Sequence, residues 1–231
     1  MLAASKGYGV HAIEPSHKNF KALKLSVAQN HFEDKITLHH TALSSEVGGA
    51  LCMKGIHGPH GNVGNVALTA ENYHHEKDFV KTCPDEDRVD IVPLEAVVPI
   101  NTNWGLAIIG CDGCEARAIL GARTLLDGPT PPCGLFIDWN HPNTANIEGT
   151  QLNEVLASAG DVLTQAGYTF YHPRFHATGR TEIVAADASA TGFWKHRFTL
   201  LAVHPSERCF PPDSAKWKTL TSNLLNEVTV V

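Results

Sequence analysis

The stretch VHAIEPSHKNF, from Val10 to Phe20, indicates the fold class. Residues 10–13 are mostly apolar and predict a buried strand, which ends in an acid, Glu14. Pro15 then sets the backbone for a first helical turn, and Ser16 is typical of a helix N-cap. A strand that turns directly into a helix is the repeating unit of α/β proteins.

The acid at the carboxyl end of this strand has two interpretations. One carboxylate can accept hydrogen bonds from both hydroxyls of an adenosine ribose, and nucleotide-binding α/β folds place an acid at such a strand end. Alternatively, Glu14 only begins the helix, where the macrodipole favours a negative side chain. This stretch alone leaves both interpretations open.

Composition predicts one soluble globular domain with a small ligand. The chain has 231 residues, of which 43% are hydrophobic and 18% charged, without a long apolar run that could span a membrane. The first ten residues lack a charged leader and a continuous apolar core, so we expect no signal peptide. A net charge of -6 argues against nucleic acid as the main partner.

The six cysteines are unevenly spaced and do not resemble the disulfide framework of a small secreted domain. They predict reduced thiols in an intracellular protein.

Strands and helices alternate along the chain, which predicts a mostly parallel α/β sheet. The continuous apolar run LAIIG, residues 106–110, is typical of a strand that is covered on both faces. Residues 174–196 show no clear pattern and are expected to form a long loop. Helices are expected over 17–30, 115–126 and 151–168, and further strands over 35–45, 134–140, 169–173 and 198–205.

Several segments follow one another in the order of a known enzyme family. They are the acid-proline turn at Glu14 and Pro15, ALSS at 42–45, VPLEAVV at 92–98 and IIGCDGCEARAILGA at 108–122. This order resembles the FkbM family of S-adenosylmethionine-dependent methyltransferases. The family signature Lys-Ile-Asp-Val-Glu-Gly-x-Glu is followed by a Gly-Ala pair, which is Gly121 and Ala122 here.

The signature falls on residues 108–115 when it is counted back from that pair. Three positions keep an acid or a glycine where the family has one: Asp112, Gly113 and Glu115. Other positions depart from the family's residues: Glu95 stands in place of the aspartate of a Leu-Asp pair, Ile108 in place of the lysine and Gly110 in place of the aspartate, and Cys114 takes a place that is often aromatic.

The resemblance implies a role for five residues. It implies that Glu14 holds the ribose of S-adenosylmethionine and that Ala42 packs against the adenine. It implies that Asp112 and Glu115 lie on the acceptor side, and that Asp138, at the end of a strand, lies near the acceptor. The opposing interpretation places Asp112 and Glu115 simply in the first turn of a helix. The expected acceptor is an oxygen of a small molecule or sugar, and no metal site is predicted.

The implied fold is a Rossmann-like class I methyltransferase sheet, mostly parallel with an antiparallel closing strand, lacking its first strand. The family's glycine-rich Asp-x-Gly-x-x-x-Gly loop does not occur in this sequence. We expect an N-terminally incomplete methyltransferase-like domain over 1–205 and a helical tail over 206–231. Without a central strand two sheet edges lose their partners, and each unpaired buried backbone group costs on the order of 1 to 3 kcal/mol, so a marginally stable fold is expected.

Two other functions remain open. The motif CDGC, from Cys111 to Cys114, is similar to thioredoxin-like redox sites because it stands between a strand and a helix. A non-catalytic relic of the methyltransferase fold is the second. The fourteen histidines suggest no metal signature, because neighbours such as His39 and His40 on a strand point to opposite faces, and solvated loop histidines are favoured over a zinc site.

Overall fold

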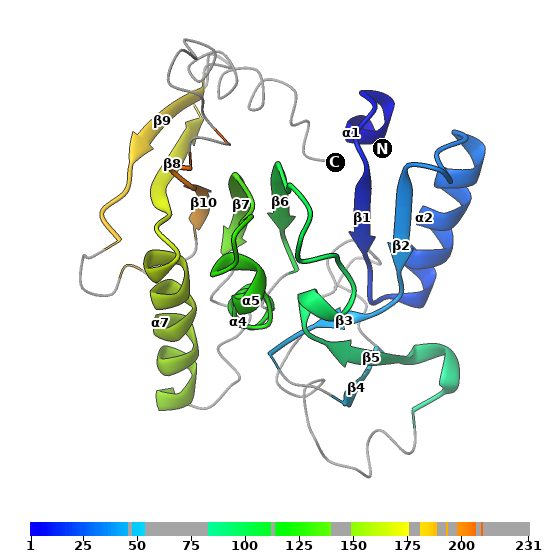
Figure 1. The fold of residues 1–231 in the computed structure, drawn as a ribbon. Helices are drawn as coiled ribbons and strands as arrows, with labels where there is room; N and C mark the ends of the chain where they lie inside the picture. Colours follow the sequence, from blue (N-terminus) through cyan, green and yellow to red (C-terminus); the bar gives the residue numbers. More distant parts are fainter. Residues whose placement is uncertain are drawn as a thin grey trace.

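The computed structural model describes residues 1–45, 48–53, 83–111, 114–139, 149–175, 181–188, 193, 198–206 and 209. Within these residues the strands form three sheets (Figure 1). A parallel pair consists of β1 (Val10–Ile13) and β2 (Ile36–His39). A small sheet has the order β3 (Ala42–Leu43), β5 (Arg88–Val92), β4 (Gly49–Cys52). The third sheet has the order β6 (Leu106–Ile109), β7 (Gly134–Trp139), β10 (Phe198–Val203), β8 (Thr169–Phe175), β9 (Thr181–Ala185).

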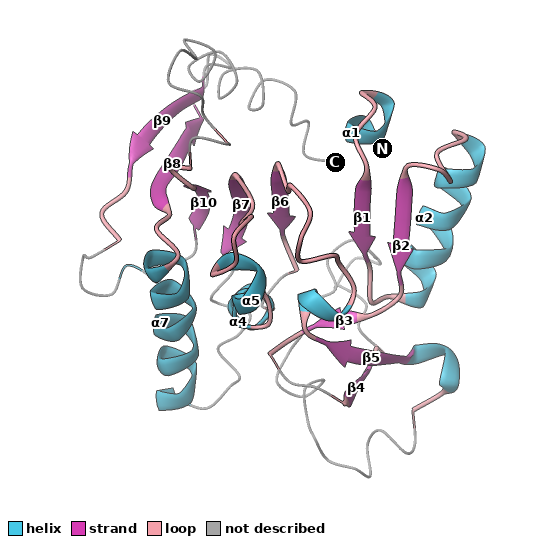
Figure 2. Ribbon diagram, in the orientation of Figure 1, coloured by secondary structure: helices cyan, strands magenta, loops and turns pink. Residues whose placement is uncertain are grey.

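Helices connect these strands, so the protein is a mixed α/β structure (Figure 2). The described residues include the α-helices α1 (Leu2–Ser5), α2 (His17–Gln29), α4 (Glu115–Leu120), α5 (Arg123–Leu126) and α7 (Gly149–Gln165), and the short 3-10 helices η2 (Asp85–Asp87) and η3 (Leu94–Ala96).

The predicted strand–turn–helix at the N-terminus is confirmed. Ser16 is the N-cap of α2, and its hydroxyl oxygen accepts a hydrogen bond from the Asn19 N–H at 3.4 Å. Pro15 lies one residue before the cap and not in the first turn. Val27 on α2 and Ile36 on β2 are buried in one small core, which is how an amphipathic helix covers a parallel pair of strands.

The five-stranded sheet contains the predicted antiparallel closing strand. β10 lies between β7 and β8 and runs antiparallel to both, whereas β6 and β7 are parallel. The prediction of a mostly parallel sheet is wrong for the described strands, because four of their seven pairings are antiparallel. Two of the four are β4 with β5 and β8 with β9. β9 lies inside the stretch 174–196, which had been expected to form a loop.

Strand β6 agrees with one expectation and departs from another, because its unpaired edge was expected and its exposed face was not. Among the described residues β6 pairs only with β7, and β1 pairs only with β2. The side chains of Ile108 and Leu106 are 67% and 37% exposed, so the prediction of a strand covered on both faces is wrong. A ring contact joins the pair β1 and β2 to the segment just before β6: the ring centroids of His11 on β1 and Trp104 lie 5.3 Å apart.

Three segments that carried the family resemblance meet at one point. Gly121 is the C-cap residue that follows α4, and a Cβ atom at this position would overlap the backbone carbonyl of Ser44 in the ALSS turn. The Gly121 carbonyl accepts a hydrogen bond from the Leu94 N–H at 3.0 Å. Next to Leu94, a carboxylate oxygen of Glu95 accepts from the Thr124 hydroxyl at 2.8 Å. Only glycine allows this close approach of the two chain segments.

All six cysteines lie in the described part of the chain, and all are paired: Cys52 with Cys83, Cys111 with Cys114, and Cys133 with Cys209. The prediction of reduced thiols is therefore wrong for this structure. Two of the pairs are 31 and 76 residues apart in sequence but have Cα atoms 5.8 and 5.2 Å apart, within the range that a disulfide requires. Spacing alone could not show that the fold joins them.

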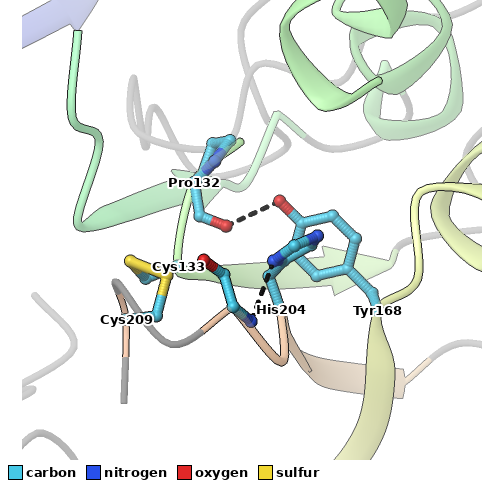
Figure 3. The surroundings of a disulfide bond; sticks show 6 residues. Pro132, Cys133, Tyr168, His204 and Cys209 are labelled. Atoms are coloured by element: carbon cyan, nitrogen blue, oxygen red, sulfur yellow. Dashed lines mark hydrogen bonds between the residues drawn. A yellow bond between two sulfur atoms is a disulfide. The ribbon is translucent and has the colours of Figure 1, made fainter. Parts of the chain in front are cut away.

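The bond between Cys133 and Cys209 ties the end of the described chain to the start of β7 (Figure 3). The His204 N–H donates to the Cys133 carbonyl at 3.0 Å, and the Tyr168 hydroxyl donates to the Pro132 carbonyl at 2.7 Å. The expected helical tail over 206–231 lies outside the described residues, except for two of them. No described helix is long and apolar enough to cross a membrane.

Candidate functional site

Glu14 lies where the sequence places it, at the carboxyl end of β1. Its N–H donates to the His39 carbonyl at 3.1 Å, which continues the pairing with β2. Its carboxylate oxygen Oε1 accepts from the Ser16 N–H at 2.8 Å. Burial raises the pKa of Glu14, although the hydrogen bonds from Ser16 and Asn19 act in the opposite direction. The carboxylate thus closes the turn into α2, and it is half-buried.

His40 lies between the Glu14 turn and α2. Its ring centroid is 4.8 Å from that of Phe20 and 5.4 Å from that of His17. Burial and the neighbouring His17 lower the pKa of His40, while a hydrogen bond with the Pro15 backbone and the charge of Asp90 raise it less. Its Nε2 atom is buried and has no hydrogen-bond partner in the described part of the chain.

His39 points to the other side of the strand pair. Its Nε2 lies 2.9 Å from Nδ1 of His11, the two rings are stacked, and Trp104 packs edge-on against His11. Burial lowers the pKa of both histidines, and for His39 the charge of His11 adds to the effect. The prediction that His39 and His40 face opposite sides is confirmed. Both are half-buried against aromatic rings and are not solvated loop residues.

Sequence reasoning missed the partners of these histidines. His11 and His39 come together only because β1 and β2 pair in parallel, with Ala12 opposite Leu38. Trp104 joins them from a segment far along the chain. No spacing in the sequence signals either contact. Within the described residues, no group of three or more potential metal ligands is found.

Ala42 lies in the core of the small sheet. It belongs to β3, beyond the end of β2, and pairs with Ile91 of β5. The same buried cluster contains Leu51 and Cys114, and Cys111 packs against it. Ala42 therefore shares a buried cluster with Cys114, the residue that precedes α4.

Glu115 is the first residue of α4 and is only 3% exposed. Its Oε1 atom accepts from the Cys111 N–H at 3.1 Å, so the carboxylate spans the same loop as the Cys111–Cys114 disulfide. Asp112 lies inside this loop and outside the described residues. The structure thus places Glu115 in the first turn of a helix, as the opposing interpretation expected, and also against the loop of the family signature.

Asp138 lies near the carboxyl end of β7, beside Gly110. The parallel register pairs Ile109 with Ile137, and a Cβ atom at Gly110 would lie 3.8 Å from Cβ of Asp138. Asp138 is half-buried, whereas the next residue, Trp139, is only 1% exposed in the core. The strand therefore directs Trp139 inward and leaves Asp138 at the opposite face.

The candidate residues form two groups in the structure. Glu14 lies at the end of β1 with the histidines, and Ala42, Glu115 and Asp138 lie around β6 and its neighbours. The ring contact between His11 and Trp104 joins the strand pair that carries Glu14 to the segment that leads into β6.

Comparisons with known proteins add one similar structure. No protein-family model matches the chain, and no curated protein matches it. The crystal structure of methyltransferase FkbM from Methylobacillus flagellatus is similar to this structure with a TM-score of 0.45 and 16% sequence identity. The match covers 85% of this chain and 36% of that one, so this chain spans little more than a third of that protein. Similarity at this level establishes neither a shared fold nor a shared activity.

Proposed function

We propose that the chain is a methyltransferase-type protein that binds S-adenosylmethionine and transfers its methyl group to an oxygen of a small molecule or sugar. The observation that carries the proposal is the strand–turn–helix at β1 and α2, which holds the half-buried Glu14 carboxylate at the carboxyl end of a parallel strand. The antiparallel β10 between β7 and β8 is consistent with it. The contact between the ALSS turn and Gly121 supports it further, since both belong to the family resemblance.

Glu14 fits the ribose of the cofactor, because it is a half-buried carboxylate that could accept from the ribose hydroxyls. Ala42 is only 2% exposed in the core of the small sheet, so its proposed contact with the adenine would require the side chains around it to move. The buried Nε2 atom of His40, next to the Glu14 turn, is of the kind that a ligand or an ordered water normally satisfies. For the methionine half we assign no residue, since the sequence contains no Asp-x-Gly-x-x-x-Gly loop.

The acids near β6 would act on the acceptor. S-adenosylmethionine, when bound, supplies a methyl group on a positively charged sulfur. An acceptor hydroxyl loses a proton during such a transfer, and a positioned carboxylate can take it. Asp138 is proposed for that role because it is half-buried at the end of β7. Glu115 is proposed to position the loop between β6 and α4, because its carboxylate accepts a hydrogen bond from the Cys111 N–H. Asp112 remains a proposed acceptor-side residue.

Titration with S-adenosylhomocysteine tests the proposal. We expect the full chain to bind it, and Glu14→Gln to weaken binding by about 10- to 100-fold, as the loss of a charged hydrogen bond of about 1.5 to 3 kcal/mol implies. Glu33→Gln is the matched control, because Glu33 is exposed just after α2. Absence of binding to the unsubstituted chain would refute the proposal, and equal affinity of Glu14→Gln would remove Glu14 from the site. Binding without methyl transfer to any sugar or small hydroxyl compound would favour the non-catalytic alternative.

A further inference from the structure

We propose that the Cys111–Cys114 disulfide is a thiol–disulfide exchange site, which dithiol reductants open and oxidants close while the protein stays folded. We further propose that its redox state controls the surroundings of Ala42. The second part rests on the proposed function, in which Ala42 packs against the adenine. The first part stands on the placement of the cysteines alone.

The three disulfides differ in the length of chain that each one closes. Cys111 and Cys114 are 3 residues apart, whereas the other pairs are 31 and 76 residues apart. A disulfide stabilises a fold more when it closes a longer loop, because it removes more freedom from the unfolded chain. Opening the Cys111–Cys114 bond therefore costs the fold the least.

The surroundings of the three bonds also differ. Cys52 is buried in β4, opposite Arg88 of β5. Cys133 accepts from the His204 N–H, and its own N–H donates to the Trp104 carbonyl at 3.1 Å. Cys111 lies in the loop after β6 and is half-buried, as Cys83, Cys133 and Cys209 also are, while Cys114 is only 4% exposed. Loop length therefore distinguishes this bond from the other two, and within the pair we expect a thiolate from solvent to attack the more exposed residue, Cys111.

The exchange balances with a dithiol as the reductant. One thiolate of the dithiol attacks Sγ of Cys111, the bond between the two protein sulfurs breaks, and Cys114 leaves as a thiolate that takes a proton. The second thiolate of the dithiol then attacks its own sulfur in the mixed disulfide. Cys111 leaves as a thiolate and is protonated, and the dithiol becomes a cyclic or intramolecular disulfide. The protein gains two electrons and two protons, which a disulfide oxidant removes in the reverse direction.

Opening this bond affects the core around Ala42. Cys114 belongs to the buried cluster that contains Ala42, and Cys111 packs against the same cluster. Two free thiols cannot stay at bonding distance, so one sulfur must move away, and a packed interior tolerates such a change poorly. The Cys111 N–H also donates to the buried Glu115 carboxylate, so a movement of Cys111 reaches the start of α4.

Stepwise reduction of the full chain tests the exchange site. The oxidised protein is equilibrated with increasing concentrations of dithiothreitol, free thiols are alkylated with iodoacetamide, and the labelled cysteines are identified by mass spectrometry. We expect Cys111 and Cys114 to be labelled first and together, with the cooperative melt retained, and reoxidation to restore the bond. Labelling of Cys52, Cys83, Cys133 or Cys209 at a lower concentration would overturn the proposal. Loss of the cooperative melt as the first two thiols appear would do the same.

The double variant Cys111→Ser/Cys114→Ala and its control Cys52→Ser/Cys83→Ser complete the test. The first variant should melt within a few degrees of the protein in which only the Cys111–Cys114 bond is reduced. The second variant should melt at a lower temperature than the first. S-adenosylhomocysteine is then titrated into the oxidised and the reduced chain, and we expect the two affinities to differ at least fivefold. Equal affinities would refute control of the Ala42 site while the exchange site stands. Binding by neither form would refute the proposed function, and the thiol mapping would remain decisive for the exchange site.

Discussion

Nδ1 of His11 and Nε2 of His39 lie 2.9 Å apart on adjacent parallel strands. At this distance one nitrogen must donate and the other must accept, so the contact cannot form when both rings carry two protons. Burial lowers the pKa of both rings, and the two charges would repel each other. Folding therefore favours the neutral form of the two imidazole rings.

The first prediction is a loss of stability in mild acid. The unfolded chain takes up protons as the pH falls through the ordinary histidine value of 6.5, while the folded chain resists until its lowered pKa is reached. The contribution of the pair is thus fully present above 6.5 and is lost below it. Between about pH 7.5 and pH 5, the melting temperature should fall less for His11→Gln than for the unsubstituted chain.

His31→Asn is the control for this series. His31 is exposed and has a backbone φ of 57°, which asparagine tolerates, so this variant removes an imidazole outside the His11–His39 pair without straining the backbone. Identical pH profiles for His11→Gln and the unsubstituted chain would mean that the imidazole pair has no role in acid sensitivity.

Local signals in the sequence predicted the strand–turn–helix formed by β1 and α2 well. Ser16 is an N-cap because its hydroxyl can reach the third amide of a helix, and this property depends only on a few neighbouring residues. Phe20, Leu23 and Val27 recur at helical spacing in the sequence, and Val27 is buried on the side of α2 that covers the strands. The order of segments also led to Gly121, whose close approach to Ser44 the structure then explained.

Features that depend on which strands pair could not be predicted in the same way. Ile108 belongs to an apolar run that is typical of a buried strand, yet its exposure depends on whether another segment covers β6. The disulfide between Cys133 and Cys209 depends on β10 returning beside β7. The Glu14 site is a mixed case, because the sequence located the acid but not His40 or His39 around it.

The second prediction concerns Gly121. Gly121→Ala places a methyl group onto the Ser44 carbonyl, and the neighbour is backbone that cannot turn away. We expect a loss of about 1 to 3 kcal/mol in the free energy of unfolding, measured by urea titration. Gly9→Ala is the control, since no atom lies within 4 Å of a Cβ there, and it should change stability by no more than about 0.5 kcal/mol. A tolerated Gly121→Ala would contradict the close approach of α4 to the ALSS turn.

The third prediction concerns the edge of β6. An exposed apolar strand edge that lacks a described partner favours association between copies of a chain. Ile108→Lys should reduce concentration-dependent association in light scattering and should change the free energy of unfolding by no more than about 0.5 kcal/mol, because this side chain is 67% exposed. Ile109→Lys is the matched control. Ile109 packs against two core clusters, so a charge there should destabilise the fold strongly. Strong destabilisation by Ile108→Lys would show that the side chain is covered.

The fourth prediction separates stability from binding at Glu14. Because burial raises the pKa of this carboxyl, the protonated form suits the fold better, and its stabilising contribution is lost as the pH rises from the ordinary value of 4.5 through the raised value. Glu14→Gln keeps an oxygen that can accept from the Ser16 N–H but carries no charge. Relative to the unsubstituted chain, its melting temperature should be equal near pH 4 and higher near pH 7, while its affinity for S-adenosylhomocysteine falls. A carboxylate kept at a cost in stability would fit the proposed ligand-binding role of Glu14. A variant that is less stable at neutral pH would instead assign Glu14 to the turn into α2 alone.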